Sequence, residues 1–451
     1  MTRNEKPRIE NLSTDYLIIG AGAMGLAFAD TLVKEDVGAK IIIVDKRAMP
    51  GGHWVDAYPF VTLHQPAAAY GVNSTKLGSG GADLSSHAEL IFYFETVMKK
   101  LTASGRVTFL PLCICDEFTD DEVNIRSLVD SDTRYSISIK RRLVDATYMK
   151  VQVPASHPPK YSVSDDYTLV PPNGLIRLDK SWRQYTIIGA GKTGIDAILF
   201  LLDSGVSPDK IQWIISNDMW MWNRANVQID NVVSELTRHL KTLKAASSIA
   251  DIFLQLEAQG SVFRLDSTTM PSKWRCATVA PEEFEQLKKV KNVVRLGRVK
   301  DIREGEIILT QGCVPTDPNN LHVDCSANGL EQRPATPIFQ GKRLTLQSVF
   351  MCQQVFSAAV IAKVEALQMN DEQRNTMWKV VPHPERVEDY PESLVQSFEN
   401  VLNGNRYLPW WLMKSRLNIM SHMRLPRYLV ASLHALIVTR GTRKALTRFK
   451  S

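Results

Sequence analysis

The sequence has few cysteines and none of the spacings that cysteine-based sites use. Its 451 residues include six cysteines, and no two of them form a CxxC pair. A chain of this length with so few cysteines carries no disulfide framework. Without CxxC pairs, the sequence indicates neither a zinc ribbon nor a dithiol redox centre, and we expect no bound metal.

Long apolar runs and a secretory signal are also missing. No apolar run approaches the roughly 18 residues that a membrane-spanning helix needs. The first residues, MTRNEKPRIENLSTDY, are polar and lack the apolar core of a signal peptide. These absences predict an intracellular, cytoplasmic protein.

Acidic residues are absent from the last part of the chain. Residues 401–451 contain ten Lys or Arg and no Asp or Glu, whereas the first 400 residues carry 44 basic and 48 acidic side chains. Because the body is mildly acidic, we expect no nucleic-acid partner. The basic tail is expected to form a terminal helix docked on the body, and peripheral contact with an anionic membrane is the less favoured alternative.

A glycine-rich turn stands between two apolar strands near the start of the chain. The strand DYLII leads into GAGAMG and a helical segment, and the next strand ends at an acid. In a dinucleotide-binding fingerprint the first glycine makes the tight turn, the second admits a pyrophosphate and the third lets the helix pack on the strand. The helix start attracts phosphates, and the acid accepts bonds from ribose hydroxyls. The segment therefore predicts a dinucleotide site built from Gly20, Gly22, Gly25 and Asp45.

The same pattern returns 169 residues later. A strand, YTII, precedes GAGKTG, and a helix and the strand IQWIIS follow. This second unit predicts another dinucleotide site, formed by Gly189, Gly191, Lys192, Thr193 and Gly194. Two such units in one chain suggest a fixed flavin and a transient nicotinamide, with hydride passing between them.

The residues at the end of the strand IQWIIS indicate which nicotinamide nucleotide binds. Ser216 and Asn217 stand there in place of a carboxylate, so a 2′-phosphate would meet no repulsion, and Arg224 could pair with it. These residues favour NADPH over NADH. Asp218 is evidence for NADH.

Further motifs after the first unit carry a family resemblance. Gly51-Gly52-His53-Trp54 and Asp56-Ala-Tyr58-Pro59 follow the first acid at short distance. With the two glycine turns, they make the sequence resemble the flavoproteins with two dinucleotide-binding domains, most closely the flavin-containing and Baeyer–Villiger-type (class B) monooxygenases. The resemblance implies FAD in the first unit and NAD(P)H in the second, and it adds Gly52, Trp54 and Asp56 to the FAD-binding residues.

The chain departs from this family directly before the second glycine turn. The family has a histidine-containing fingerprint there, whereas residues 173–185 read NGLIRLDKSWRQY, without histidine. The departure puts oxygen transfer in doubt. The expected function is an NAD(P)H-dependent monooxygenase that inserts one atom of molecular oxygen into a small organic substrate. The alternatives are an FAD-dependent dehydrogenase or oxidase and, less favoured, a flavin-bearing binding protein.

Three further residues are candidates for the flavin pocket. By the resemblance, the stretch after the first unit passes beside the isoalloxazine ring. His53 and His64 are therefore candidate acids or bases, with core packing as the alternative. Gln354 opens an expected helix whose N-terminus would stabilise negative charge on a reduced ring, unless it is only a polar cap.

The patterns together predict an α/β protein with two Rossmann-like domains and a helical C-terminal extension. We expect a helix at 87–102, an irregular stretch at 267–280 and strands between 292 and 324. The expected division is an FAD-binding first part (10–150), an NAD(P)-binding domain (151–319) with a helical insert (232–280), a returning FAD-binding part (320–400) and a basic helical extension (401–451). Substrate contacts are expected from the insert.

Overall fold

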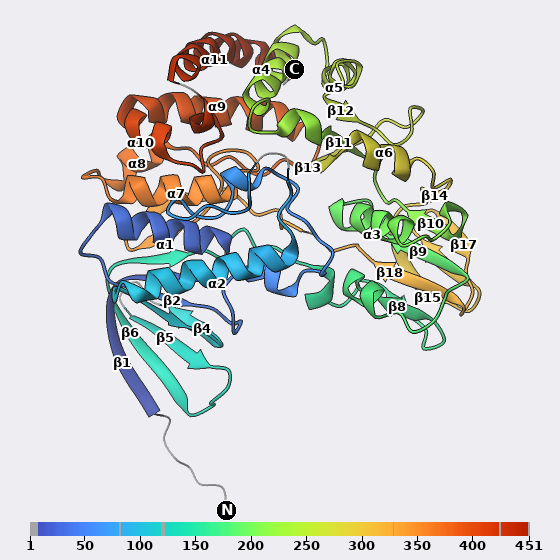
Figure 1. Ribbon diagram of the computed structural model, residues 1–451, viewed down its shortest axis with the longest axis horizontal. Coiled ribbons are helices and arrows are strands. Elements are labelled where there is room, and N and C mark those ends of the chain that lie inside the picture. The colour runs from blue at the N-terminus through green and yellow to red at the C-terminus, as the bar shows by residue number, and fades with distance from the viewer. Residues whose placement is uncertain (1–7, 81–82, 119–121, 328, 424, 450–451) are drawn as a thin grey trace, which may run out of the picture.

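The computed structural model describes residues 8–80, 83–118, 122–327, 329–423 and 425–449. Two open sheets, one mixed and one parallel, lie apart in the molecule, and a layer of helices covers one side of the first sheet (Figure 1). This arrangement confirms the α/β class with two Rossmann-like units. The tail residues 424, 450 and 451 lie outside the described residues.

The first sheet has the order β19-β20-β6-β1-β2-β3, with a β4–β5 hairpin joined to β6. The central strands are parallel, as βαβ crossovers require, and β19 and the hairpin are antiparallel. The chain leaves this sheet after β6 and returns to it only with the last two strands. The bounds are β1 (Arg8–Ile19), β2 (Ile41–Val44), β3 (Val107–Leu110), β4 (Cys113–Phe118), β5 (Glu122–Ser127), β6 (Thr133–Asp145), β19 (Phe339–Gln340) and β20 (Arg343–Thr345).

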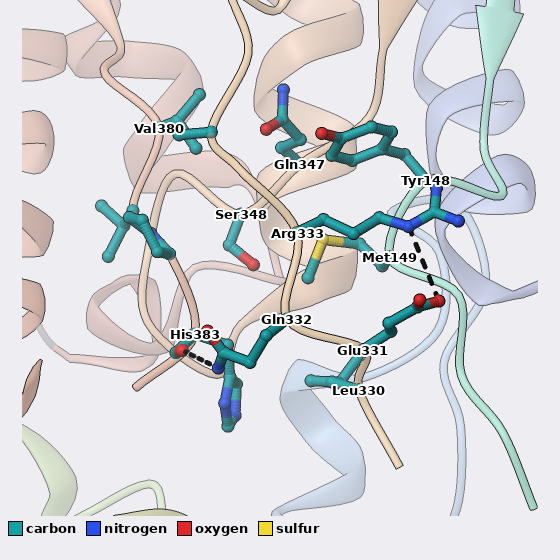
Figure 2. A pocket seen from close by; sticks show the side chains of 13 residues that line it. Tyr148, Met149, Leu330, Glu331, Gln332, Arg333, Gln347, Ser348, Val380 and His383 are labelled. Atoms are coloured by element: carbon teal, nitrogen blue, oxygen red, sulfur yellow. Dashed lines mark hydrogen bonds and ion pairs between the residues drawn. The ribbon is translucent and has the colours of Figure 1, made fainter. Parts of the chain in front are cut away.

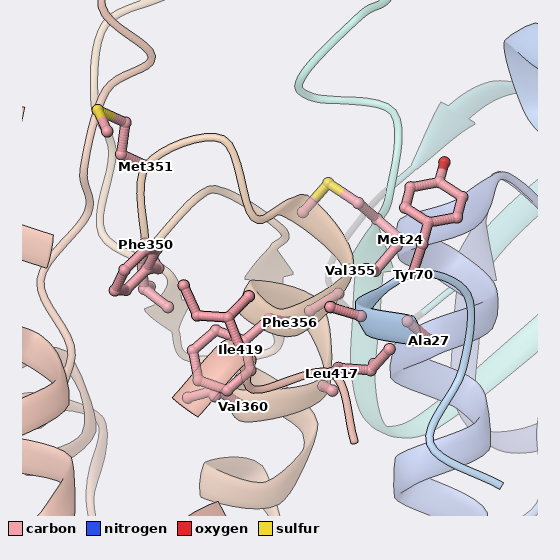
Figure 3. Packing of buried hydrophobic residues seen from close by; sticks show 14 of the residues in the cluster. Met24, Ala27, Tyr70, Phe350, Met351, Val355, Phe356, Val360, Leu417 and Ile419 are labelled. Carbon is pink, nitrogen blue, oxygen red and sulfur yellow. The ribbon is translucent and has the colours of Figure 1, made fainter. Parts of the chain in front are cut away.

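Three helices pack against the first sheet: α1 (Ala23–Glu35), α2 (His87–Ala103) and α7 (Gln354–Glu365). The expected helix at 87–102 is confirmed as α2, which begins at a capping box formed by Ser86 and Glu89. Nearly every residue of α7 is buried, as expected for a helix that is apolar all round. Figure 3 shows Val355 and Phe356 of α7 among the side chains packed near α1 and a C-terminal loop.

The second sheet has the order β14-β10-β9-β18-β8, and all its strands are parallel. Helices α3 (Lys192–Asp203) and α6 (Pro281–Leu287) accompany it. A smaller sheet, β17-β16-β15-β7, adjoins it. The strand bounds are β7 (Ser162–Val163), β8 (Thr168–Val170), β9 (Gln184–Ile188), β10 (Ile211–Ile214), β14 (Asn292–Val294), β15 (Val299–Arg303), β16 (Glu306–Leu309), β17 (Gly312–Pro315) and β18 (Asn320–Asp324).

The stretch 267–280, expected to be irregular, contains a strand. β13 (Lys273–Val279) pairs with β11 (Met219–Asn223), which also pairs with β12 (Val262–Phe263). The β11–β13 register shifts between Trp220 and Trp222. The shift interrupts the regular alternation of buried and exposed residues, and the partner strand is some fifty residues away. For these reasons the sequence pattern did not predict β13.

Helices of the insert and of the C-terminal region pack together in the upper part of the molecule as drawn in Figure 1. They are α4 (Val232–Ala245), α5 (Ile249–Ala258), α8 (Asp371–Met377), α9 (Asp389–Tyr407), α10 (Pro409–Lys414) and α11 (Leu425–Leu446). The hydroxyl of Thr442 in α11 donates to Leu240 O at 3.1 Å, and Arg443 Nε donates to Glu399 Oε1 at 2.7 Å. The end of α11 is therefore docked on α4 and α9, and membrane contact through the tail stays an unfavoured prediction.

Within the described ranges, none of the helices combines the length and apolar character that crossing a bilayer demands. The cytoplasmic location stays a prediction.

Candidate functional site

The first glycine turn joins β1 to α1 closely. Gly20 has φ +106°, and its N–H donates to Val44 O at 2.7 Å. A Cβ on Gly25 would lie 2.1 Å from Gly20 O. No side chain larger than glycine therefore fits at the third position of the motif, and α1 starts directly above the strand end.

The Gly51-Gly52 step lies against this turn. Gly52 has φ +62°, and a Cβ there would lie 2.9 Å from the Cα of Gly22. Gly22 is also the N-cap of α1. All residues of this helix are described, and its start has neither a side-chain cap nor an acid in the first turn. The free N–H groups of the helix start are thus available to an anion, beside backbone contributed by two segments.

Asp45 follows β2 and its side chain turns toward the glycines. Its Oδ2 accepts from Ala21 N at 2.7 Å and its Oδ1 from Arg47 N at 2.8 Å. The carboxylate is therefore oriented at the edge of the turn, where its remaining lone pairs can accept ribose hydroxyls.

Asp56 and Trp54 are both engaged within the protein. Arg47 Nε donates to Asp56 Oδ2 at 2.9 Å. The Trp54 indole donates to the Tyr70 hydroxyl at 2.8 Å, and its carbonyl contacts His87 Nε2 at 2.8 Å. These bonds fix the short 3-10 helix Gly52–Asp56, and direct cofactor contacts by the two side chains stay predictions.

His53 and His64 are both uncharged at neutral pH. Burial, with the nearby Arg47 charge, lowers the pKa of His53 to about 4. Burial, followed by the charges of Lys192 and Arg224, lowers the pKa of His64 to about 3. Each imidazole therefore offers one N–H donor and one acceptor rather than a positive charge. A catalytic role for either residue stays a prediction.

The start of α7 leaves polar atoms without partners. Gln354 Oε1 accepts from Ser348 Oγ at 2.5 Å, but Gln354 Nε2 is buried without a hydrogen-bond partner among the described residues. Gln353 Nε2 donates to Gln65 Oε1 at 3.3 Å, and Gln353 Oε1 is likewise unpartnered in the described structure. Buried polar atoms of this kind mark a place where a polar ligand completes the bonding.

The second glycine turn repeats the close packing and leaves its middle open. Gly189 has φ +128°, and a Cβ there would lie 2.6 Å from Cys325 O. A Cβ on Gly194 would lie 2.2 Å from Gly189 O, whereas a Cβ on Gly191 would meet no described atom within 4 Å. The open space beside Gly191 is where a pyrophosphate can approach the backbone.

The segment after the first unit contacts α3 of the second. Tyr58 donates to Asp196 Oδ2 at 2.7 Å, and Asp196 also pairs with Lys192. Phe60 stacks on Phe200 with ring centroids 4.3 Å apart. Burial and the Asp196 charge raise the pKa of Tyr58 well above its usual range, so its proton stays on the phenol. The two dinucleotide units are thereby joined close to the second turn.

Arg224 and Asp218 are both ion-paired. Arg224 is buried, and its guanidinium donates to both carboxylate oxygens of Glu283 at 2.8 and 2.7 Å. Arg295 donates to Asp218 at 2.9 and 3.1 Å. A 2′-phosphate contact by Arg224 stays a prediction and would require its pair with Glu283 to open.

The structure brings together three residues that the sequence analysis missed. Cys276 and Cys352 form a disulfide although 76 residues separate them, and His383 Nε2 lies 3.8 Å from Cys352 Sγ. The sequence analysis expected no disulfide framework, and the structure holds this one disulfide; the absence of a dithiol redox centre, inferred from the missing CxxC spacing, stays a prediction. Only the position of Cys352, directly before the Gln353-Gln354 pair, gave a signal along the sequence.

A small open pocket of about 30 Å³ lies beside this cluster. His383 and Gln332 stand at one end of it, and Tyr148 and Gln347 at the other (Figure 2). Its walls come from the chain after β6, the stretch before β19 and the loop before α9. In this pocket no lining residue belongs to the helical insert, and substrate contacts by the insert stay a prediction.

Comparison with known proteins places the chain. Residues 18–73 match the family model described as an NAD(P)-binding Rossmann-like domain. The polycyclic ketone monooxygenase from the thermophilic fungus Thermothelomyces thermophila aligns with a TM-score of 0.56 at 11% identity, covering 98% of this chain and 90% of that one. This likeness confirms the expected fold resemblance to flavin monooxygenases.

Two mycobacterial relatives are much more similar in sequence. Uncharacterized protein Rv2000 of Mycobacterium tuberculosis and Uncharacterized protein Mb2023 of Mycobacterium bovis are each 41% identical over 436 residues, which span 92% of this chain and 80% of theirs. The chain therefore belongs to the same family as these mycobacterial proteins, and its fold is that of the flavin monooxygenases with two dinucleotide-binding domains.

Proposed function

We propose that the protein is an FAD-dependent oxidoreductase whose flavin, held at the first glycine turn, is reduced by NAD(P)H held at the second. The observation that carries this proposal is the junction between the two units. The segment that begins at the Gly51-Gly52 step ends on α3, where Tyr58 bonds Asp196 in the first turns of the helix. The two ligands would therefore meet along one short stretch of chain.

The residues present fit FAD. The Gly22 and Gly52 backbones and the uncapped start of α1 would hold the pyrophosphate, and Asp45 would hold the ribose. The unpartnered amide atoms of Gln353 and Gln354 would bond the polar edge of the ring system. When bound, FAD supplies hydride acceptance and electron transfer to the second substrate.

For the nicotinamide we favour NADPH, with NADH as the alternative. Gly191 leaves room for the pyrophosphate. The nearest acid after β10 is Asp218, and Arg295 pairs with it, which weakens its repulsion of a 2′-phosphate. The room at Gly191 serves either nucleotide, and the pairing of Asp218 supports NADPH.

The reaction we favour is oxygen transfer from molecular oxygen to a small organic substrate, in keeping with the fold resemblance. The absence of histidine in residues 173–185 favours a second candidate, a dehydrogenase or oxidase without oxygen transfer. In either reaction, neutral His53 and His64 would act as hydrogen-bond partners or proton acceptors near the flavin.

The test is an anaerobic absorbance spectrum of the purified protein, recorded before and after NADPH and then NADH. Flavin bands that bleach with either nucleotide support the proposal, and a protein that cannot be reconstituted with FAD contradicts it. Product mass after air is admitted separates the reactions: a gain of one oxygen supports the monooxygenase, and loss of two hydrogens supports the dehydrogenase or oxidase.

A further inference from the structure

The sulfur cluster described above is made by three separate parts of the chain. Cys276 belongs to β13, Cys352 stands just before α7, and His383 lies in the loop between α8 and α9. Their ligand atoms all lie within 4.8 Å of one another. Cys276 is buried, whereas Cys352 and His383 are partly exposed. Cys352 is thus the more exposed of the two cysteines.

Other bonds hold these three segments together without the disulfide. Trp274 N donates to Glu385 O at 3.0 Å, which ties β13 to the His383 loop. Val381 N donates to Ser348 O at 2.8 Å, which ties the same loop to the stretch before α7. Lys273 adds an ion pair with Glu385 at 3.0 Å. Because the segments are already joined on both sides of the sulfurs, the disulfide is not needed as a staple.

Both cysteines adopt a backbone conformation that side chains disfavour. Cys276 has φ +55° and Cys352 has φ +59°. A non-glycine residue in the left-handed region is strained and persists where the surroundings impose it, most often at functional sites. Two such residues joined through their sulfurs point to a position selected for chemistry rather than for packing.

The surroundings of Cys352 suit a thiolate. It stands two residues before α7, whose N-terminal N–H groups and dipole stabilise negative charge nearby. His383 Nε2 lies 3.8 Å from Cys352 Sγ, and burial lowers the pKa of His383 to about 4, so the neutral imidazole can accept a hydrogen bond from the thiol. The unpartnered Gln354 Nε2 lies on the same helix start.

The cluster adjoins two features: the residues assigned to the flavin edge, which would supply electrons, and the pocket of Figure 2. Gln353 and Gln354, assigned to the flavin edge, follow Cys352 directly. His383 lines the pocket of Figure 2, together with Ser348 and Gln347. Cys352 therefore adjoins the residues assigned to the flavin edge, and His383 beside it lines a small pocket.

We propose that Cys276 and Cys352 are a redox-active pair that exchanges two electrons with the flavin. In the forward step the Cys276–Cys352 S–S bond breaks and two S–H groups form, while the two-electron-reduced flavin gives up two electrons and two protons and returns to the oxidised form. His383 Nε2 accepts a hydrogen bond from the Cys352 thiol so formed. This step rests on the proposed function, which supplies the reduced flavin from NAD(P)H.

The dithiol would then pass its electrons to a disulfide-bearing small molecule that reaches the partly exposed Cys352. The thiolate of Cys352 attacks one substrate sulfur, the substrate S–S bond breaks, and Cys276 resolves the mixed disulfide with release of two substrate thiols. The S–S bond of the pair forms again, and one disulfide is reduced at the expense of one NAD(P)H.

The first test counts electrons and thiols in the wild-type holoprotein. Under anaerobic conditions, full reduction is expected to consume two equivalents of NADPH per flavin, with two new thiols found by alkylation and mass spectrometry at Cys276 and Cys352. Flavin that is fully reduced by one equivalent, with no new thiols, would overturn the proposal.

The second test uses variants and a control. Cys352→Ser and Cys276→Ser should each lower the NADPH requirement to one equivalent, while Cys313→Ser, an exposed cysteine elsewhere, should leave it at two. His383→Asn should slow alkylation of Cys352 in the reduced protein about tenfold or more, because the proton acceptor is lost. Equal alkylation rates in wild type and His383→Asn would remove His383 from the mechanism.

A third measurement separates this proposal from failure of the proposed function. Flavin is reduced by light in place of NADPH, so a defective nicotinamide site does not affect the result. The free protein is also equilibrated with glutathione buffers, and its disulfide content and circular dichroism are followed. Reversible reduction in the folded state supports the pair. Reduction that occurs only on unfolding, or reduced protein that holds one zinc per chain and gives no electrons to oxidised flavin, overturns it.

Discussion

The phenol of Tyr58 donates a hydrogen bond of 2.7 Å to Oδ2 of Asp196 and so joins the segment after the first glycine turn to the first turns of α3. Asp196 is also paired with Lys192, the first residue of that helix. One phenol thus helps to set the position of the second glycine turn relative to the first unit.

Tyr58→Phe should weaken nicotinamide use without removing flavin. A hydrogen bond to a charged group contributes about 1.5–3 kcal/mol, so we expect the KM for NADPH in anaerobic flavin reduction to rise about tenfold. Tyr167→Phe is the matched control, because Tyr167 accepts from Gly305 N at 2.6 Å elsewhere in the second unit. An unchanged KM in Tyr58→Phe would show that the junction does not position the nucleotide.

Asp45→Asn should release FAD. The change keeps the shape of the side chain but removes the charge that accepts from Ala21 N and would accept from the ribose. We expect the Kd for FAD to rise about tenfold or more, since charge-assisted hydrogen bonds are roughly twice as strong as neutral ones. Fluorescence quenching of added FAD measures the Kd. Asp36→Asn, in a surface pair with Arg141, should bind FAD like wild type.

Two glycine substitutions should separate folding from binding. Gly191→Ala adds a methyl group in open space at φ −70°, so Tm should hold while the KM for NADPH rises. Gly52→Ala places a Cβ 2.9 Å from the Cα of Gly22 at φ +62°, which should cost about 1–3 kcal/mol of stability and displace FAD. Scanning calorimetry and flavin content measure both. A loss of Tm in Gly191→Ala with normal nucleotide binding would contradict the assignment of the second turn.

His64 should make the protein less stable in mild acid. Its pKa is about 3 in the folded chain and about 6.5 in the unfolded chain, so the unfolded state binds the extra proton between these values. Its contribution is constant above about pH 6.5 and destabilises increasingly as the pH falls toward 3. His64→Gln should therefore flatten the dependence of Tm on pH between 6.5 and 4. A Tm curve parallel to wild type would show that His64 is charged in the folded protein.

In the fold and in the candidate site alike, local motifs were predictable from the sequence and long-range contacts were not. The residues of both glycine turns and Asp45 were identified from local spacing alone, because a strand, a tight turn and a helix start lie within a few consecutive residues. The strand β13 was missed, since its register depends on β11 and shifts between Trp220 and Trp222. The partner of Arg224 was missed too, because Glu283 is 59 residues away.

The sequence by itself determined the two dinucleotide-binding units, the buried helix that begins at Gln354 and the likeness to the flavin monooxygenases. Each of these depends on short-range steric and hydrogen-bonding requirements, which leave a readable spacing along the chain. Only the tertiary structure decided which side chains meet between elements: Tyr58 with Asp196, and Cys276 with Cys352 and His383. Such contacts follow from how sheets and helices pack over long sequence separations, and packing leaves no fixed spacing in the sequence.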